Sequence, residues 1–363
     1  MRRALTLAAR GRYRTSPNPM VGAVVVRDGA RVGEGWHRAV GGPHAEVEAL
    51  RTAGEAARGA TVVVTLEPCR HHGRTPPCVD ALVAAGVQRV IVAHLDPDER
   101  MRGGGVEALR RAGIDVATGL LADEAIRLNL RYLVPKLLGR PLVTLKWAMS
   151  LDGRIATEQG ESQWITSPPA RRWALALREE HDAVLVGSGT VLADDPRLDR
   201  RLGLAGEAGL RVVLDRRLRV GPGARLFAGG GPVLLYTESN DTARQRELAS
   251  RGASVVPLPA VTPSSVLADL ARRGVGSVLV EGGAEVAASF VSAGAFDRVL
   301  VAVAPLLIGG ERARGPLAGD GLGPLAELPR LEGWRWARRG GDLTIEGLRA
   351  GCSRELCERS GRS

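Results

Sequence analysis

Short β-branched runs alternate with helical patterns along almost the whole chain, and Gly139-Arg140-Pro141 interrupts this alternation. Glycine and proline in close succession end a helix and mark a boundary. Alternation of this kind favours sheets with largely parallel strands, covered by helices. At about 150 residues per domain, 363 residues suggest two domains. We therefore expect α/β domains over 1–140 and 141–350. The polar tail 351–363 lacks apolar periodicity, so we expect it to be disordered.

The individual elements follow from apolar periodicity, turn residues and helix-capping residues. In the first half we expect strands at 20–26, 31–36, 61–66, 88–93 and 114–117, and helices at 44–50, 78–85, 106–112 and 121–138. In the second half we expect strands at 142–148, 183–187, 210–214, 232–236 and 277–281, and helices at 168–180, from 263 onwards and at 284–293.

Composition limits the classes of protein and partner. No apolar run approaches the roughly 20 residues that span a bilayer, and no secretory signal is recognisable, so we expect a cytoplasmic protein without a membrane partner. The formal charge is +10, but arginines are scattered and aromatic residues make up 3% of the chain. This pattern predicts phosphorylated small molecules rather than nucleic acid as partners. The oligomeric state stays open, with a homo-oligomer among the alternatives.

A candidate metal site lies in the first half of the chain. His44 precedes Glu46 by two residues, and Cys69 and Cys78 follow around a proline-rich segment. Catalytic zinc takes three protein ligands and keeps one position for water, whose pKa it lowers towards about 7. We expect His44, Cys69 and Cys78 to bind zinc. Glu46 would move protons without binding the metal, as in the deaminase pattern H-x-E followed by P-C-x-x-C.

The spacing of the two cysteines departs from that pattern. Eight residues separate Cys69 from Cys78, instead of two. Cys78 follows Pro76-Pro77 and begins an expected helix, where a thiolate is favoured. The longer loop can therefore still supply a ligand. The alternative interpretation is a surface histidine with incidental cysteines.

Several strings together resemble the bifunctional deaminase–reductases of riboflavin biosynthesis. In the first half they are Ser16-Pro17-Asn18-Pro19-Met20-Val21-Gly22, Pro43-His44-Ala45-Glu46, Thr65-Leu66-Glu67-Pro68-Cys69 and His72-Gly73-Arg74-Thr75-Pro76-Pro77-Cys78. In the second half they are Lys146-Trp147-Ala148-Met149-Ser150-Leu151-Asp152-Gly153, Ser162-Gln163-Trp164-Ile165-Thr166-Ser167, Thr190-Val191-Leu192-Ala193-Asp194-Asp195-Pro196 and Val280-Glu281-Gly282-Gly283. The resemblance extends from about residue 4 to 348.

The resemblance implies a cytidine-deaminase-like α/β/α sandwich followed by a dihydrofolate-reductase-like α/β domain. It implies two consecutive steps: zinc-dependent hydrolytic deamination of 2,5-diamino-6-(5-phosphoribosylamino)pyrimidin-4-one, then NADPH-dependent reduction of the ribosyl group of 5-amino-6-(5-phosphoribosylamino)uracil to ribityl. By motif position, the residues that line the deaminase pocket are Asn18, His37, His71 and Arg74. Arg74 would meet the phosphate through charge-assisted hydrogen bonds.

The resemblance also implies the reductase site. The residues expected to contact NADPH are Ala148, Trp164, Thr190, Asp194, Gly283, Ala284, Glu285, Val286, Ala287, Ala288 and Ser289. Those expected to contact the sugar phosphate are Ser162, Arg178, Leu198, Arg201 and Glu281. Lys146, Asp194 and Glu281 would polarise the sugar and handle protons. A structural ion pair is the alternative for Lys146 and Asp194.

Two glycine-containing turns are weak signals for phosphate binding. These are Gly282-Gly283 and the segment Gly187-Ser188-Gly189-Thr190, each after an expected strand. Neither is the G-x-G-x-x-G fingerprint, so a Rossmann dehydrogenase is not supported. Arg216 also follows a strand, at a position where relatives often carry a small hydroxyl residue. We expect Arg216 to bind the 2′-phosphate of NADPH. Asp199 stands where threonine is usual.

Other functions stay open at this point. A nucleic-acid base deaminase shares the His-Ala-Glu and Pro-Cys strings, but the second domain and the wide cysteine spacing disfavour it. A specialised paralogue could act on a related pyrimidine. A non-catalytic binding protein with a relict deaminase fold is disfavoured, because all four expected metal-site residues are present.

Overall fold

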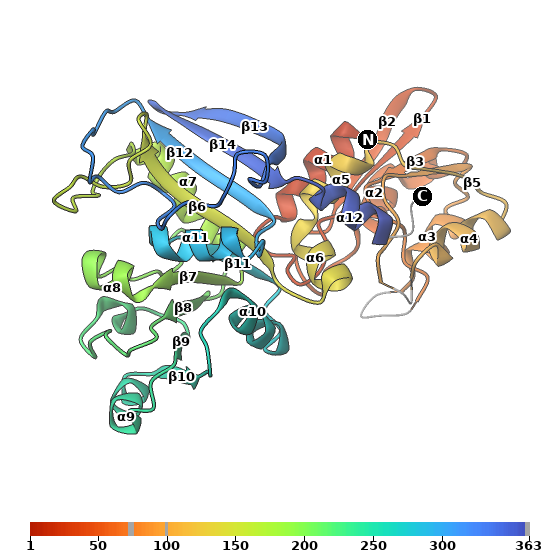
Figure 1. The fold of residues 1–363 in the computed structure, drawn as a ribbon. Coiled ribbons are helices and arrows are strands. Elements are labelled where there is room, and N and C mark those ends of the chain that lie inside the picture. The colour runs from red at the N-terminus through yellow and green to blue at the C-terminus, as the bar shows by residue number, and fades with distance from the viewer. Residues whose placement is uncertain (72–75, 99–100, 360–363) are drawn as a thin grey trace. The chain divides into compact units, whose positions relative to one another are not determined.

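The computed structural model describes residues 1–71, 76–98 and 101–359. The chain divides into two compact units, Met1–Gly139 together with the segment that begins at Ser353, and Arg140–Cys352. The division after Gly139 coincides with the break in the sequence pattern, and both units are α/β as expected (Figure 1). Among the described residues, no helix is long and apolar enough to cross a membrane.

The first unit is built on a five-stranded sheet in the order β2-β1-β3-β4-β5. β1 is antiparallel to both its neighbours, whereas β3, β4 and β5 run parallel. The strands are β1 (Gly22–Arg27), β2 (Ala30–Trp36), β3 (Thr61–Val64), β4 (Arg89–Val92) and β5 (Asp115–Thr118). The helices are α1 (Arg2–Ala8), α2 (Ala45–Ala53), α3 (Cys78–Ala84), α4 (Gly104–Arg111), α5 (Ala122–Leu128) and α6 (Leu130–Leu138).

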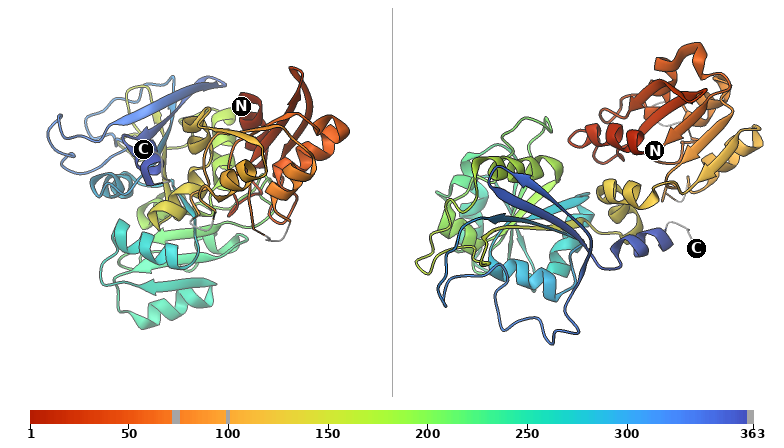
Figure 2. Two further views of the ribbon diagram at one scale, coloured as in Figure 1. Left: turned by 90° about the vertical axis from the view of Figure 1, so that its right-hand side faces the viewer. Right: turned by 90° about the horizontal axis from the view of Figure 1, so that it is seen from above.

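Helices cover both faces of this sheet, because successive side chains of a strand point to opposite faces. Val25 packs with Ala49 of α2 and Leu82 of α3 in one apolar cluster. Val24, one residue earlier, packs with Leu7 of α1 on the other face. The result is the expected α/β/α sandwich, which Figure 2 shows from two further directions.

The second unit is built on a nine-stranded sheet in the order β10-β9-β8-β7-β11-β6-β12-β14-β13. The strands from β10 to β12 are parallel, and β14 and β13 continue the sheet antiparallel. The strands are β6 (Leu142–Ser150), β7 (Ala183–Gly187), β8 (Leu210–Leu214), β9 (Val233–Thr237), β10 (Ala253–Pro257), β11 (Ser277–Val280), β12 (Arg298–Ala304), β13 (Leu331–Arg339) and β14 (Asp342–Arg349). The helices are α7 (Pro168–Glu180), α8 (Ser188–Asp194), α9 (Thr242–Ser250), α10 (Pro263–Arg272) and α11 (Ala284–Ser292).

Three features differ from the sequence-based expectation. The tail is not wholly disordered, because α12 spans Cys352–Arg359 with Cys352 and Leu356 buried. The expected helix over 121–138 is two helices, α5 and α6, divided at Asn129. The strands β12, β13 and β14 lie beyond the last strand expected. Side chains on both faces of the edge strand β13 are exposed, so its sequence lacks the alternation of a half-buried strand.

Candidate active sites and membership of a protein family

The three expected metal ligands converge in the first unit. His44 precedes α2, Cys78 is the first residue of α3, and Cys69 lies in the loop after β3. His44 Nδ1 lies 3.1 Å from Cys78 Sγ and 3.4 Å from Cys69 Sγ. The three ligand atoms all lie within 4.8 Å of one another. A histidine nitrogen and two sulfurs gathered from three elements fit one zinc ion.

The thiol groups of Cys69 and Cys78 differ in pKa. The pKa of Cys69 is lowered to about 4, because the Cys78 thiol donates a hydrogen bond to it and His44 lies beside it. The Cys78 N–H, at the start of α3, also donates to Cys69 Sγ at 3.3 Å. The same contact with Cys69 raises the pKa of Cys78. Of the two sulfurs, Cys69 is therefore the one favoured as a thiolate, the form in which cysteine binds a metal.

Glu46 lies on the first turn of α2 and is only 3% exposed. Burial raises the pKa of its carboxyl to about 7. A carboxyl group in this range can both accept and release a proton near neutral pH. Glu46 follows the expected metal ligand His44 by two residues, so it is the carboxyl group next to the metal site.

Asn18 and His37 extend the site on the histidine side. The rings of His37 and His44 meet edge to face, with centroids 5.6 Å apart. Asn18 Nδ2 lies 3.3 Å from His37 Nε2, and His37 Nδ1 lies 3.1 Å from Pro43 O. Burial lowers the pKa of His37. The structure thus places two of the expected pocket residues beside the metal ligands.

The other two expected pocket residues have different outcomes. His71 is exposed, and its Nδ1 lies 2.8 Å from Met101 Sδ. Arg74 lies outside the described residues. Their roles in the pocket stay predictions.

Glu67 supports the metal site, and the sequence analysis did not assign it a role. It is 4% exposed, and its Oε1 accepts N–H groups of Gly105 and Val106 at 2.8 and 3.1 Å. Its Oε2 accepts those of Asp96 and Gly103 at 3.1 and 2.9 Å. Because Glu67 precedes Cys69 by two residues, these bonds fix the loop that carries a metal ligand. The string Thr65-Leu66-Glu67-Pro68-Cys69 contained this residue, but its hydrogen-bond partners lie 29 to 39 residues further along the chain.

A buried charged group lies in the second unit, where β6 and β11 are parallel neighbours. Arg178 of α7 holds Glu281 with three hydrogen bonds: Nε donates to Oε1 at 3.0 Å and to Oε2 at 3.2 Å, and Nη2 donates to Oε2 at 2.6 Å. Burial lowers the pKa of Lys146, against the effect of Glu281. Burial alone would raise the pKa of Glu281, but Arg178 and Lys146 lower it below its usual value. Three expected site residues therefore form one electrostatic group.

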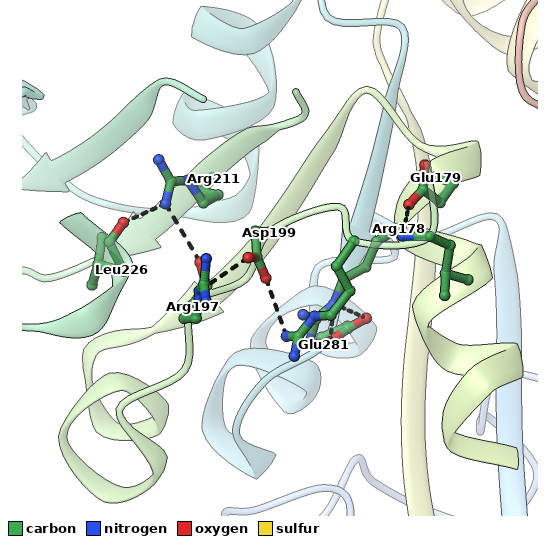
Figure 3. Close-up of polar contacts among 9 residues, drawn as sticks. Arg178, Glu179, Arg197, Asp199, Arg211, Leu226 and Glu281 are labelled. Carbon is green, nitrogen blue, oxygen red and sulfur yellow. Dashed lines mark hydrogen bonds and ion pairs between the residues drawn. The ribbon is translucent and has the colours of Figure 1, made fainter. Parts of the chain in front are cut away.

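The loop after α8 brings further charges to this group (Figure 3). Asp199 Oδ1 pairs with Arg201 Nη2 at 3.1 Å, and its Oδ2 pairs with Arg197 Nε at 3.0 Å. Leu198, between them, is buried and has a positive φ of 56°. The expected substrate residue Arg201 is thus held by the carboxylate that replaces the usual threonine.

The two glycine-containing segments lie side by side, although residues 188–190 form the start of helix α8 and not the expected turn. β7 and β11 are parallel neighbours, so their carboxyl ends lie at one edge of the sheet. A Cβ at Gly282 would lie 2.8 Å from Thr190 Oγ1, and one at Gly187 would lie 2.8 Å from Val286 Cγ2. Only glycine permits this approach. Thr190 is therefore adjacent to the start of the expected cofactor stretch 283–289.

The remaining expected reductase residues lie in varied surroundings. Ser162 Oγ donates to Asp194 Oδ1 at 3.2 Å. Trp164 is 68% exposed, and the Arg171 guanidinium lies 4.5 Å from its ring centroid. Arg216 is exposed after β8. Ala148 is half-buried on β6, and in the stretch Gly283, Ala284, Glu285, Val286, Ala287, Ala288 and Ser289 the two alanines 287 and 288 are buried. Their contacts with a cofactor stay predictions.

Comparisons with known proteins agree with both halves. Residues 1–94 match the cytidine and deoxycytidylate deaminase zinc-binding region, and residues 141–344 match the RibD C-terminal domain. A riboflavin biosynthesis protein RibD from Bacillus amyloliquefaciens is 43% identical, covering 96% of this chain and 95% of that protein. RibD from Escherichia coli is 43% identical, covering 92% of this chain and 94% of that protein.

Solved structures agree as well. Acinetobacter baumannii RibD, in its form 1, has a TM-score of 0.83 at 38% identity, covering 96% of this chain and 97% of that chain. A diaminohydroxyphosphoribosylaminopyrimidine deaminase/5-amino-6-(5-phosphoribosylamino)uracil reductase from Thermotoga maritima has a TM-score of 0.80 at 36% identity, with the same coverage. The expected resemblance is confirmed over nearly the whole chain: it belongs to the RibD family of riboflavin biosynthesis enzymes, with a deaminase domain followed by a reductase domain.

Proposed function

We propose that this chain deaminates 2,5-diamino-6-(5-phosphoribosylamino)pyrimidin-4-one and then reduces the resulting 5-amino-6-(5-phosphoribosylamino)uracil with NADPH. The observation that carries the proposal is the convergence of His44, Cys69 and Cys78 beside the buried Glu46 in one unit. A second, separate group of Lys146, Arg178 and Glu281 occupies the other unit. Two chemically different sites suit two consecutive reactions.

In the deaminase unit, His44, Cys69 and Cys78 would hold the zinc ion. Zinc bound there supplies a water molecule of lowered pKa. Glu46 takes one proton from the attacking water and delivers it to the ring nitrogen, because it is the buried carboxyl next to the ligands. It then carries the remaining hydroxyl proton to the amine, which leaves as ammonia when its bond to the ring carbon breaks. Asn18 and His37 orient the pyrimidine ring through their polar groups. Water and substrate thus give the uracil ring and ammonia.

In the reductase unit, NADPH supplies a hydride to the sugar carbon. The bond from that carbon to the ring oxygen of the sugar would break, and Lys146 would donate a proton to the oxygen, which becomes a hydroxyl group. The Arg178–Glu281 pair fixes the charge around Lys146, because its hydrogen bonds hold both side chains. Ser162 and Arg201 bind the sugar phosphate, and Asp194 orients Ser162 through their hydrogen bond. The open edge beside Thr190 and Gly283 would receive the cofactor.

We also propose that the enzyme works in the cytoplasm on small molecules and not on nucleic acid. Arginines spread along the chain support this more than they support a nucleic-acid surface. The oligomeric state is not part of the proposal.

Incubation of the purified, zinc-loaded chain with the diaminopyrimidinone phosphate tests the proposal. Without NADPH we expect ammonia and the uracil product, and with NADPH the ribityl product, both read by mass. Deamination of an oligonucleotide in place of the free pyrimidine would contradict the assignment. Failure to consume NADPH when the uracil substrate is supplied directly would refute the second step.

A further inference from the structure

A buried carboxylate fastens the loop that carries Arg201 to the end of α7. This carboxylate is Glu179, which belongs to α7 and is only 2% exposed (Figure 3). Its Oε1 accepts the Leu202 N–H at 2.8 Å, and its Oε2 accepts the N–H groups of Leu204 and Ala205 at 3.2 and 3.0 Å. Three backbone donors thus balance one buried negative charge, and they hold the chain directly after Arg201.

The backbone of this loop turns around the carboxylate. Gly203 lies between the donors Leu202 and Leu204 and has a positive φ of 69°, a conformation that glycine adopts without steric cost. Neighbouring N–H groups can then point towards one anion, as they do in other anion-binding turns. The conformation of the loop therefore depends on Glu179.

A second anchor ties the same loop to α7. Arg200 Nε donates to Arg178 O at 3.0 Å, and Arg200 Nη2 donates to His181 O. Both acceptors are carbonyl groups at the C-terminal end of α7, where a cation is favoured. Arg200 Nη1 donates to Glu207 O at 3.0 Å, further along the loop. The loop is thus fixed both before and after Arg201.

Arg201 itself stays accessible on this fixed loop. Its side chain is 48% exposed, and its Nη2 pairs with Asp199 Oδ1 at 3.1 Å. Burial raises the pKa of the Glu281 carboxyl, and the charge of Arg201 is among those that lower it. Arg201 therefore belongs to the electrostatic surroundings of the reductase group. A guanidinium in this position can meet an anionic ligand without reordering of its backbone.

We propose that Glu179 is a positioning residue for substrate recognition in the reductase unit: it fixes the loop so that Arg201 can bind the phosphate of the substrate. This inference rests on the proposed function, in which Arg201 binds that phosphate. Glu179 acts through the backbone of the loop and not by contact with the substrate. Fixing the loop before binding reduces the entropy lost on binding, so its effect falls on the affinity for the substrate.

Reduction by the full-length protein tests this with two substrates, 5-amino-6-(5-phosphoribosylamino)uracil and its dephosphorylated riboside. The ratio of their kcat/KM values measures the contribution of the phosphate. Glu179→Gln should lower this ratio about tenfold, because the amide NH₂ cannot accept the backbone N–H groups of the loop. The change should be a higher KM for the phosphorylated substrate, with kcat and the KM of NADPH within about twofold. Glu207→Gln removes the same charge from an exposed position of the loop and should leave the ratio unchanged.

A double-mutant cycle separates this role from a general loss of packing. Arg201→Ala should itself lower the ratio, and Glu179→Gln should then add little, because the group that it positions is gone. Additive losses in the double variant, or an unchanged ratio in a folded Glu179→Gln protein, would overturn the inference. If Arg201→Ala leaves the ratio unchanged, the proposed role of Arg201 fails; if it lowers the ratio and Glu179→Gln does not, only the inference fails.

Arg200→Lys tests the same loop if melting shows that Glu179→Gln does not fold. This variant keeps the positive charge but loses the forked bonds to α7. We expect the phosphate ratio to fall in the same direction as for Glu179→Gln, with the KM of NADPH unchanged. An unchanged ratio in a folded Arg200→Lys protein would show that fixing the loop does not serve phosphate binding.

Discussion

Glu67 and Gly105 are in direct contact: the Gly105 N–H donates to Glu67 Oε1 at 2.8 Å, and a Cβ at Gly105 would lie 2.0 Å from the carbonyl oxygen of Pro68. A carboxylate and a glycine far apart in the chain thus hold the loop that ends in Cys69. The zinc site therefore depends on a contact that includes none of its ligands.

Replacing Glu67 by Gln should destabilise the first unit by about 1–3 kcal/mol, because the amide NH₂ cannot accept the backbone N–H groups that now point at the carboxylate. The affinity for zinc should fall as well, since the loop that carries Cys69 is no longer fixed by Glu67. Thermal melting and a competitive zinc titration measure both. Glu107→Gln, on the exposed face of α4, is the matched control, and equal behaviour of the two variants would contradict the positioning role.

Glu46→Gln should keep zinc and lose deamination by about 10²- to 10⁴-fold, because the isosteric amide cannot move protons. Metal content and ammonia release are the measurements. Glu48→Gln, two residues further along α2 and paired with Arg51 at 2.8 Å, should retain activity. Near-normal turnover of a zinc-replete Glu46→Gln protein would refute the role of Glu46 as proton carrier.

Cys69→Ser should abolish zinc binding and deamination but leave reduction of the pre-formed uracil substrate largely intact. The reason is that the zinc ligands all lie in the first unit and Lys146, Arg178 and Glu281 all lie in the second. Circular dichroism and melting would detect loss of folding without zinc. Cys357→Ser serves as the control for a lost thiol. Simultaneous loss of both activities in a well-folded Cys69→Ser protein would contradict separate sites.

Lys146→Ala should impair reduction and spare deamination, because it removes a half-buried cation whose charge acts on Glu281. NADPH oxidation with the uracil substrate measures the first activity, and ammonia release measures the second. Lys136→Ala, on α6, should leave reduction unchanged. Normal reduction by Lys146→Ala would show that the charge of Lys146 has only a structural role.

We predict that the free energy of unfolding of the second unit depends on pH through the carboxyl group of Asp152. Its pKa is lowered from 3.8 to about 2, first by the hydrogen bond from Ser150 Oγ and then by the N–H groups of Gly309 and Ile308. A lowered folded-state pKa means that the carboxylate stabilises the fold above about pH 4, and that this contribution is lost as pH falls towards 2. Denaturation at several pH values should show the loss, and Asp152→Asn should flatten it. An unchanged pH profile in Asp152→Asn would exclude Asp152 as its source.

The sequence by itself determined both α/β domains and the grouping of His44, Cys69 and Cys78 beside Glu46. These follow from local information, because strand and helix periods, the Gly139–Pro141 break and the order His44, Glu46, Cys69, Cys78 are all readable along the chain. The helix after Pro77 that begins with Cys78 is an example, since proline favours the position before or at a helix start.

Only the tertiary structure decided which distant groups support those residues. The Asn129 amide bonds both backbone groups of Met20 at 2.8 and 2.9 Å, which explains why the expected helix 121–138 is divided there. Residues far apart in sequence also meet elsewhere. Glu67 contacts its backbone partners, Arg219 contacts Ser188, and Leu356 of α12 is buried in the fold. Such contacts carry no local period, because they depend on how strands and loops pack once the sheet has formed.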